Sequence, residues 1–331
     1  MVKKSSNIIT GYKAFYSDFT YRGQQFCIGS TYDIDKCVGV DKSLFCFCPD
    51  FPIDALRFTM LIDDKRQLSK FAQVHTDTDS LGWKEYETCR ETSKITIDKE
   101  VTLDELIITH IDKIYSSVKR SKYAPHVSVD NNALLPLDTY ATMSASGYRS
   151  QIVSRQWHTK ASISGDLSSI AVCGYRPKLT SSGDRCLLLV VGNEAEITAR
   201  GRYPIIYASG EGANITLNAH SAFVLTGGEH SQITSSGFGS RLVATHNSSR
   251  IVSTGDADTC ICYGQDGDIF LGGRQSRFRG AEGTLITAVI RSYLYGPPRC
   301  SILTGRIGEK DLKPDTFYRV FDGRFVALED E

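Results

Sequence analysis

A nine-residue repeat constrains the fold of this chain more than any other feature. Stepping by nine through residues 147–273 gives fifteen positions, and twelve of them hold glycine. The three exceptions are Gln156, Ala219 and His246. The residue five places after each start is apolar in every repeat, and its neighbours two places away are mostly small. This alternation is typical of a β-strand, and we expect each glycine to supply the backbone freedom for a tight corner. The pattern predicts an all-β solenoid over 146–283.

The outward positions predict how many repeats make one coil. Six residues after each start, alternate repeats carry an apolar or a hydroxylated side chain. The apolar set is Val153, Ala171, Leu189, Tyr207, Leu225, Val243 and Ile261. The hydroxylated set begins Ser162, Thr180, Thr198, Thr216 and Thr234. Since side-chain character follows the parity of the repeat, successive nonapeptides should lie on opposite faces of the stack. One coil then has about 18 residues, and about seven coils would form a rod on the order of 35 Å long.

One side of this solenoid is predicted to be apolar. We define the apolar face as Leu187, Leu189, Ile205, Tyr207, Phe223, Leu225, Val243 and Ile261. A contiguous exposed patch of this kind usually marks an interface. Three alternatives stay open. Another part of the chain covers the face (the N-terminal domain, the helix near 103–118 or the C-terminal tail), or two copies pair across it as a dimer, or a foreign protein binds it.

The ends of the chain predict separate parts. Residues 9–120 read as an α+β domain, in which apolar periodicity and a capping Thr102 predict a helix over 103–118. Residues 121–145 read as a connection leading into the rod. Residues 284–331 read as a cap, because Asp322-Gly323 lies at the centre of a hairpin pattern over 319–326. A cap is expected because an open solenoid end exposes unpaired strand edges.

Composition excludes several classes of protein. The 38 basic and 38 acidic side chains give a net charge of zero. Proteins that bind nucleic acids are usually strongly basic, so a nucleic-acid-binding role is not expected. Apolar runs are too short for a transmembrane helix or a signal peptide, so neither a membrane location nor secretion is expected. The ten cysteines lack regular spacing and are expected to be reduced thiols in a cytoplasmic protein. The Cys46/Cys48 and Cys260/Cys262 pairs favour core packing over zinc, and we expect no metal site and no cofactor.

Several short motifs carry a resemblance. They are GYKAF at 11–15, RGQQF at 22–26, LFCFCP at 44–49 and SGDLSS at 164–169. The chain resembles a family of uncharacterised phage and prophage proteins that open with these motifs and continue into short glycine-rich repeats. The resemblance implies a phage origin, and therefore the cytoplasm of an infected bacterial host. It implies no activity, and at 44–49 the chain departs from the family pattern, which has a Gly-x-His-Phe run there.

The N-terminal domain suggests one enzymatic alternative. Its order of strands and helix loosely resembles the NAD-binding half of ADP-ribosyltransferases, for which Tyr12, Arg22 and Glu105 would be the catalytic candidates. This alternative rests on analogy of fold. Two others are a sponge for a nucleotide signal and a structural module of the virion.

A binding role fits the sequence best, because it predicts a large ordered surface and no catalytic constellation. We expect a non-enzymatic binding or inhibitor protein, dimeric through the apolar face. The rigid solenoid would be presented to a host protein, such as a component of anti-phage defence. Rigid surfaces lose little conformational entropy on binding, which favours this use.

Overall fold

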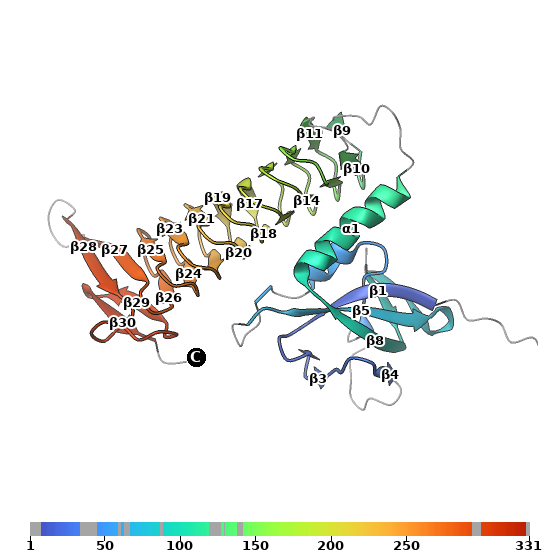
Figure 1. The fold of residues 1–331 in the computed structure, drawn as a ribbon, viewed down its shortest axis with the longest axis horizontal. Coiled ribbons are helices and arrows are strands. Elements are labelled where there is room, and N and C mark those ends of the chain that lie inside the picture. Colours follow the sequence, from blue (N-terminus) through green and yellow to red (C-terminus); the bar gives the residue numbers. More distant parts are fainter. Residues whose placement is uncertain are drawn as a thin grey trace, which may run out of the picture. The chain divides into compact units, whose positions relative to one another are not determined.

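The fold is that of a computed structural model, which describes residues 8–33, 45–58, 61–62, 67–86, 89–118, 127–128, 130–137, 142–292 and 299–328 (Figure 1). The chain divides into two compact units, 1–113 and 114–331. We call the first unit the head. The solenoid and its cap make up most of the second.

The head is built on a four-stranded antiparallel sheet in the order β1-β5-β8-β4. Its core is aromatic, with Phe15, Phe26 and Phe47 fully buried. The α+β character predicted for this part is confirmed, and Pro52–Arg57 adds a short 3-10 helix. The elements are β1 (Ile8–Phe15), β2 (Thr20–Tyr21), β3 (Gln24–Gln25), β4 (Thr31–Asp33), η3 (Pro52–Arg57), β5 (Lys70–Asp77), η4 (Thr78–Ser80), β6 (Leu81–Tyr86), β7 (Cys89–Thr92) and β8 (Lys94–Val101).

The predicted long helix is α1 (Leu103–Ser117). A capping box starts it: the Thr102 amide donates to Glu105 Oε2 at 2.7 Å, and the Glu105 amide donates to Thr102 Oγ1 at 3.2 Å. The apolar stripe of the helix is buried as the 3.6-residue periodicity predicts. Its buried members are Leu103, Leu106, Ile107, His110, Ile111 and Ile114.

Residues 127–327 form two parallel sheets, each closed at one end by antiparallel strands (Figure 1). One sheet holds β10 (Leu134–Leu137), β12 (Gln151–Ser154), β14 (Ser169–Cys173), β16 (Leu187–Val191), β18 (Ile205–Ala208), β20 (Phe223–Thr226), β22 (Arg241–Ala244), β24 (Thr259–Cys262), β26 (Arg277–Gly280), β29 (Tyr318–Phe321) and β30 (Arg324–Ala327). The other holds β9 (Val127–Ser128), β11 (Thr142–Ala145), β13 (Lys160–Ile163), β15 (Lys178–Ser181), β17 (Glu196–Arg202), β19 (Asn214–His220), β21 (Gln232–Ser235), β23 (Arg250–Ser253), β25 (Asp268–Leu271), β27 (Leu285–Ser292) and β28 (Arg299–Arg306).

The strand register confirms an 18-residue coil with successive nonapeptides in opposite sheets. Leu189 pairs with Tyr207, and Tyr207 pairs with Leu225 in the next strand of the same sheet. Thr180, Thr198 and Thr216 are matched in the same way in the other sheet. The apolar residues five places after each start form one continuous core between the sheets.

The repeated glycines serve a different purpose from the one expected. A Cβ built on Gly228 would lie 2.0 Å from the carbonyl oxygen of Gly210 in the preceding coil, and one on Gly255 would lie 1.6 Å from that of Gly237. Most of these glycines do not have positive φ. The corner is instead turned two residues later, where every repeat has a residue in the left-handed region. These residues are Arg149, His158, Leu167, Arg176, Arg185, Glu194, Tyr203, Gly212, Ser221, His230, Gly239, Ser248, Ala257, Asp266 and Gln275. Glycine is therefore used for close approach between coils.

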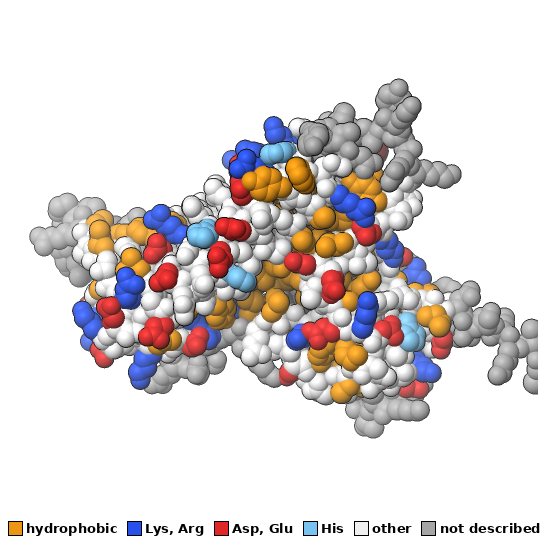
Figure 2. All heavy atoms as spheres, in the orientation of Figure 1, with side chains coloured by type: hydrophobic (Ala, Val, Ile, Leu, Met, Phe, Trp, Pro, Cys, Tyr) orange, Lys and Arg blue, Asp and Glu red, His pale blue; other side chains and the backbone are white. Residues whose placement is uncertain are grey.

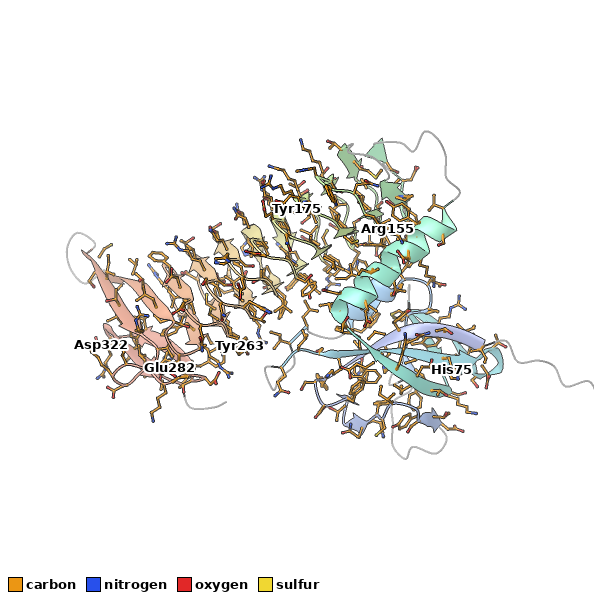
Figure 3. The ribbon with its side chains drawn as sticks, viewed as in Figure 1. His75, Arg155, Tyr175, Tyr263, Glu282 and Asp322 are labelled. Carbon is orange, nitrogen blue, oxygen red and sulfur yellow. A yellow bond between two sulfur atoms is a disulfide. The ribbon has the colours of Figure 1, made fainter. Side chains whose placement is uncertain are left out.

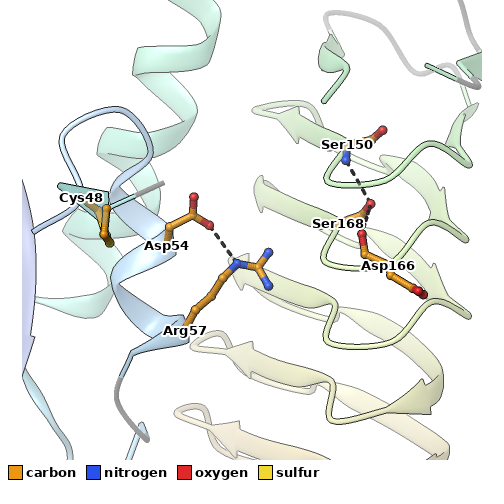
Figure 4. Close-up of polar contacts among 7 residues, drawn as sticks. Cys48, Asp54, Arg57, Ser150, Asp166 and Ser168 are labelled. Carbon is orange, nitrogen blue, oxygen red and sulfur yellow. Dashed lines mark hydrogen bonds and ion pairs between the residues drawn. A yellow bond between two sulfur atoms is a disulfide. The ribbon is translucent and has the colours of Figure 1, made fainter. Parts of the chain in front are cut away.

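Hydrogen-bond ladders hold the corners of successive coils together. The side chain of Asp184 accepts from the Arg202 amide at 2.8 Å, and the Asp184 amide donates to Asp166 at 2.8 Å. Inside the stack, the Ser150 amide donates to Ser168 Oγ at 3.0 Å (Figure 4). The small polar residues of the repeat thus satisfy buried backbone groups that a corner leaves without strand partners.

Both ends of the solenoid differ from the sequence boundaries. The segment predicted to be a connection contributes β9, β10 and β11, and Leu135 of β10 pairs in register with Ile152. At the far end the predicted hairpin is confirmed as β29 and β30, with Asp322 and Gly323 at its turn (Figure 3). β29 pairs antiparallel with β26, and β28 pairs antiparallel with β27. The cap therefore covers the last parallel strand of each sheet.

One prediction about the cysteines is wrong. Cys48 and Cys89 form a disulfide within the head, whereas all ten cysteines were expected to be reduced. The two residues are 41 positions apart, and no regular cysteine spacing indicated the pairing. Cys260 and Cys262 are buried in β24, in agreement with their expected packing role.

Candidate interaction surface

The side chains of the predicted apolar face lie in register on one side of their sheet, and most of them are buried. Leu189, Val243 and Ile261 are 0% exposed, and Tyr207, the most open of the outward column, is 9% exposed. Ile205 and Phe223 are partly buried, and Leu187 and Leu225 are buried. The sequence therefore placed these residues together correctly.

This burial bears on what the face can do. The outward residues of the other sheet are, in contrast, mostly exposed. Stable dimer interfaces require a large exposed apolar surface on each partner. A homodimer through this face stays a prediction. The outward residues of the other sheet form a second candidate for a binding surface.

The opposite sheet presents a polar face that is open to solvent. We define the polar face as the outward residues Lys160, Ser162, Lys178, Thr180, Glu196, Thr198, Asn214, Thr216, Gln232 and Thr234. All are exposed except Ser162, which is partly exposed. Lys178 and Glu196, on neighbouring strands, form an ion pair at 2.7 Å. Figure 2 shows acidic, basic and histidine side chains mixed over the visible side of the solenoid, with no large patch of a single charge sign there.

An aromatic cluster stands at the edge of the polar face, in the corners that lead into β13 and β15. The indole of Trp157 is 62% exposed and meets the Tyr175 ring edge-on, with centroids 6.5 Å apart. His158 contacts the same ring at 6.1 Å. The Arg176 guanidinium lies 4.9 Å from the Tyr175 centroid, and Tyr175 lies at the edge of the stack of coils (Figure 3). We call Trp157, His158, Tyr175 and Arg176 the aromatic edge.

Neighbouring groups fix the aromatic edge in place. The Tyr175 hydroxyl donates to Glu194 Oε1 at 2.5 Å, and Arg176 Nε donates to Glu194 Oε2 at 2.6 Å. Glu194 raises the pKa of Tyr175 and of Arg176, since it accepts from the protonated form of each, and its own pKa is lowered in return. The backbone is also tied, because the His158 amide donates to the Tyr175 carbonyl at 2.7 Å. Glu194 thus links Tyr175 and Arg176 in one arrangement.

The aromatic edge was missed by the sequence reasoning, although the sequence contains a signal for it. Trp157 and Tyr175 stand one residue after the start of two repeats of the same parity, 18 residues apart. Corner positions are exposed in a solenoid, so large aromatic residues there have no core to fill. The outward strand positions on which the two faces were predicted do not include these corners.

The residues of the enzymatic alternative lie in the head, where the structure gives two of them other contacts. Glu105 is exposed and occupied by the capping box, which lowers the pKa of its carboxyl. Tyr12 lies on β1, and its hydroxyl bonds to the Thr109 side chain of α1, with a pKa raised mainly by burial. Arg22 stands in the turn between β2 and β3, with its guanidinium 5.7 Å from the Tyr21 centroid. These contacts give Glu105 and Tyr12 structural roles.

Two features are absent from the residues that the structure describes. In that part of the chain no group of three or more His, Cys, Asp or Glu side chains is placed to hold a metal ion. Within the same residues, no helix has the length and apolar character needed to cross a bilayer.

Comparison with protein-family models, with curated proteins and with solved structures found no match to this chain. Its own structure defines it as a two-faced β-solenoid protein with an N-terminal α+β unit and a C-terminal cap.

Proposed function

We propose that this chain is a non-enzymatic binding protein that presents the rigid polar face and its aromatic edge to a partner protein. In line with the family resemblance, the proposal takes the chain to be phage-encoded and the partner to be a host protein in the cytoplasm of an infected cell. Blocking a defence factor is the role that we favour for the complex.

The exposed aromatic edge is the observation that carries this proposal. Trp, Tyr and Arg are the residue types most enriched at the energetic centres of protein interfaces. Trp157 leaves a large apolar surface exposed directly beside Tyr175 and Arg176. The mixture of charges beside it, with Lys178 paired to Glu196, suits a protein surface better than the uniform phosphate charge of a nucleic acid.

Rigidity supports the same proposal. Every coil is bonded to the next through two strands and two corners, so little conformational entropy remains to be lost when a partner binds. The solenoid also offers side chains at a fixed strand spacing of about 4.8 Å, which favours a flat and extended partner surface.

The test is a quantitative affinity purification from infected host cells, with the chain tagged at its N-terminus. Three baits are compared: the unaltered chain, the double variant Trp157→Ala/Tyr175→Ala, and the control Phe238→Ala. Phe238 is 53% exposed and stands at the opposite edge of the stack. Loss of two central anchors should cost at least about 2 kcal/mol, or roughly 30-fold in affinity.

We expect one or a few host proteins to be retained by the unaltered chain and by Phe238→Ala, and at least tenfold less by the double variant. Equal retention by all three baits would show that the aromatic edge is not the binding surface.

A further inference from the structure

A buried lysine in the head lies outside the proposed binding surface. Lys13 is in the middle of β1, and its side chain is 4% exposed. Among the residues that the structure describes, no carboxylate forms an ion pair with its amine. Buried lysines ordinarily need such a partner, because an ammonium ion loses its hydration inside a protein.

The surroundings of the amine come from three separate motifs of the sequence. Lys13 Nζ donates to the carbonyl oxygen of Cys46 at 3.1 Å, from the LFCFCP segment. It lies 4.0 Å from the centroid of the Tyr21 ring, beside the RGQQF segment, and 5.6 Å from that of Phe15. The fold thus brings the GYKAF and LFCFCP motifs together around one amine, with Tyr21, which directly precedes RGQQF, as the third neighbour.

A small pit opens onto this group. Its lining is mostly aromatic, aliphatic or sulfur-bearing and includes Tyr12, Lys13, Tyr21, Cys46, Ala55 and Phe58. The Cys48–Cys89 disulfide forms part of the same wall. Phe58 is 41% exposed and stands at the rim. The pit is narrow, so only a small molecule or the end of a larger one can reach the amine.

Electrostatics favour the neutral amine at this position. Burial lowers the pKa of Lys13 to about 7, the nearby Cys46 opposes this shift, and the positive charge of Arg22 adds to it. Desolvation together with a neighbouring cation is the arrangement that turns a lysine into a nucleophile, because only the unprotonated amine has a free electron pair.

We propose that Lys13 is a nucleophilic amine that forms an imine with a small carbonyl compound entering the pit. The nitrogen electron pair attacks the carbonyl carbon, and the carbonyl oxygen takes up a proton to give a carbinolamine. The hydroxyl then leaves as water with the second amine proton, so one carbonyl compound is bound and one water is released. The positive charge of Arg22 helps to keep the amine unprotonated for this step. This site is independent of the aromatic edge.

Reductive trapping on the full chain tests the proposal. The protein is incubated at pH 7 with formaldehyde or with glyoxylate, in the presence of cyanoborohydride, which reduces imines. Peptide mass spectrometry then compares the rate of modification at Lys13 with that at Lys178, whose side chain is 54% exposed. The same reaction in urea serves as the unfolded control.

We expect Lys13 to be modified at least tenfold faster than Lys178 in the folded protein, and the difference to vanish in urea. The rate at Lys13 should rise with a midpoint near pH 7, and Arg22→Gln should slow it at pH 7 with either reagent, because a positive charge beside the amine is lost. Modification of Lys13 no faster than Lys178 with both reagents would overturn the proposal. An unchanged rate in Arg22→Gln would remove Arg22 from it.

Discussion

At the scale of one residue, sequence periodicity predicted the burial of His110 but not the surroundings of its ring. Its place in the apolar stripe of α1 predicted its burial, and the side chain is 0% exposed. The pattern did not predict that both ring nitrogens lack a hydrogen-bond partner among the described residues. That depends on which groups of the folded head face the ring, and they include Phe51, whose ring centroid is 6.1 Å away.

The state of His110 leads to a prediction about acid. Burial lowers its pKa from 6.5 to about 3, and the positive charges of Lys113 and Arg57 act in the same direction. The unfolded chain binds a proton on this histidine below about pH 6.5, whereas the folded head does not. Protonation of His110 in the unfolded chain therefore lowers the free energy of unfolding of the head as the pH falls below 6.5. The loss is about 2 kcal/mol between pH 7 and pH 5.

Hydrogen exchange of the β5 and β8 amides, followed from pH 7 to pH 5, measures this loss for the head alone. The rates are corrected for their intrinsic pH dependence. The variant His110→Leu should lose about 2 kcal/mol less over the same range, because leucine does not titrate. Parallel pH curves for the two proteins would show that His110 is not the group responsible.

At the scale of the repeating element, the strands were predicted correctly but the role of the glycines was not. The sequence located every strand of the repeat, because alternation within one nonapeptide is a local property. The explanation expected for the glycines was wrong. A Cβ at these positions would collide with the preceding coil, and such a contact between coils cannot be read from one repeat alone. The residue that turns each corner was not predicted, because its type differs between repeats; it is arginine at position 149 and alanine at position 257.

Two adjacent glycines provide a matched test of this explanation. A Cβ on Gly228 would lie 2.0 Å from the Gly210 carbonyl oxygen, whereas one on Gly227 meets nothing closer than Ser209 Cα at 3.4 Å. Overpacking of this severity costs about 1–3 kcal/mol or more. We expect Gly228→Ala to destabilise the solenoid by at least that amount and Gly227→Ala to change its stability by less than about 1 kcal/mol.

Thermal unfolding followed by hydrogen exchange of the β18 to β22 amides measures both variants. Both substitutions remove one glycine from the unfolded chain, so the entropic contribution cancels in the comparison. If the two variants were equally stable, close approach between coils would not explain the glycine repeat.

At the scale of the whole molecule, parity of the repeat predicted the two faces, and their register confirms it. Two features were beyond the reach of sequence reasoning. The complete burial of Leu189 and Val243 is not encoded in the repeat pattern, and the pairing of Cys48 with Cys89 depends on how the head folds. The aromatic edge, in contrast, follows from positions that the repeat had already defined.

These observations move the expected binding surface from the apolar face to the polar one. An apolar stripe read from sequence indicates a surface that must be covered, which a partner, a second copy or the chain itself can do. An exposed Trp157 beside Tyr175 and Arg176 has no such internal explanation. The account therefore depends on the aromatic edge being the place where a partner binds.

Photo-crosslinking in infected cells tests this most directly. A benzoylphenylalanine residue is placed at position 157 in one chain and at position 238, on the opposite edge, in another. The account predicts a discrete adduct with one host protein from position 157 and none from position 238. An adduct formed at 238 but not at 157, or the same adduct from both, would contradict it.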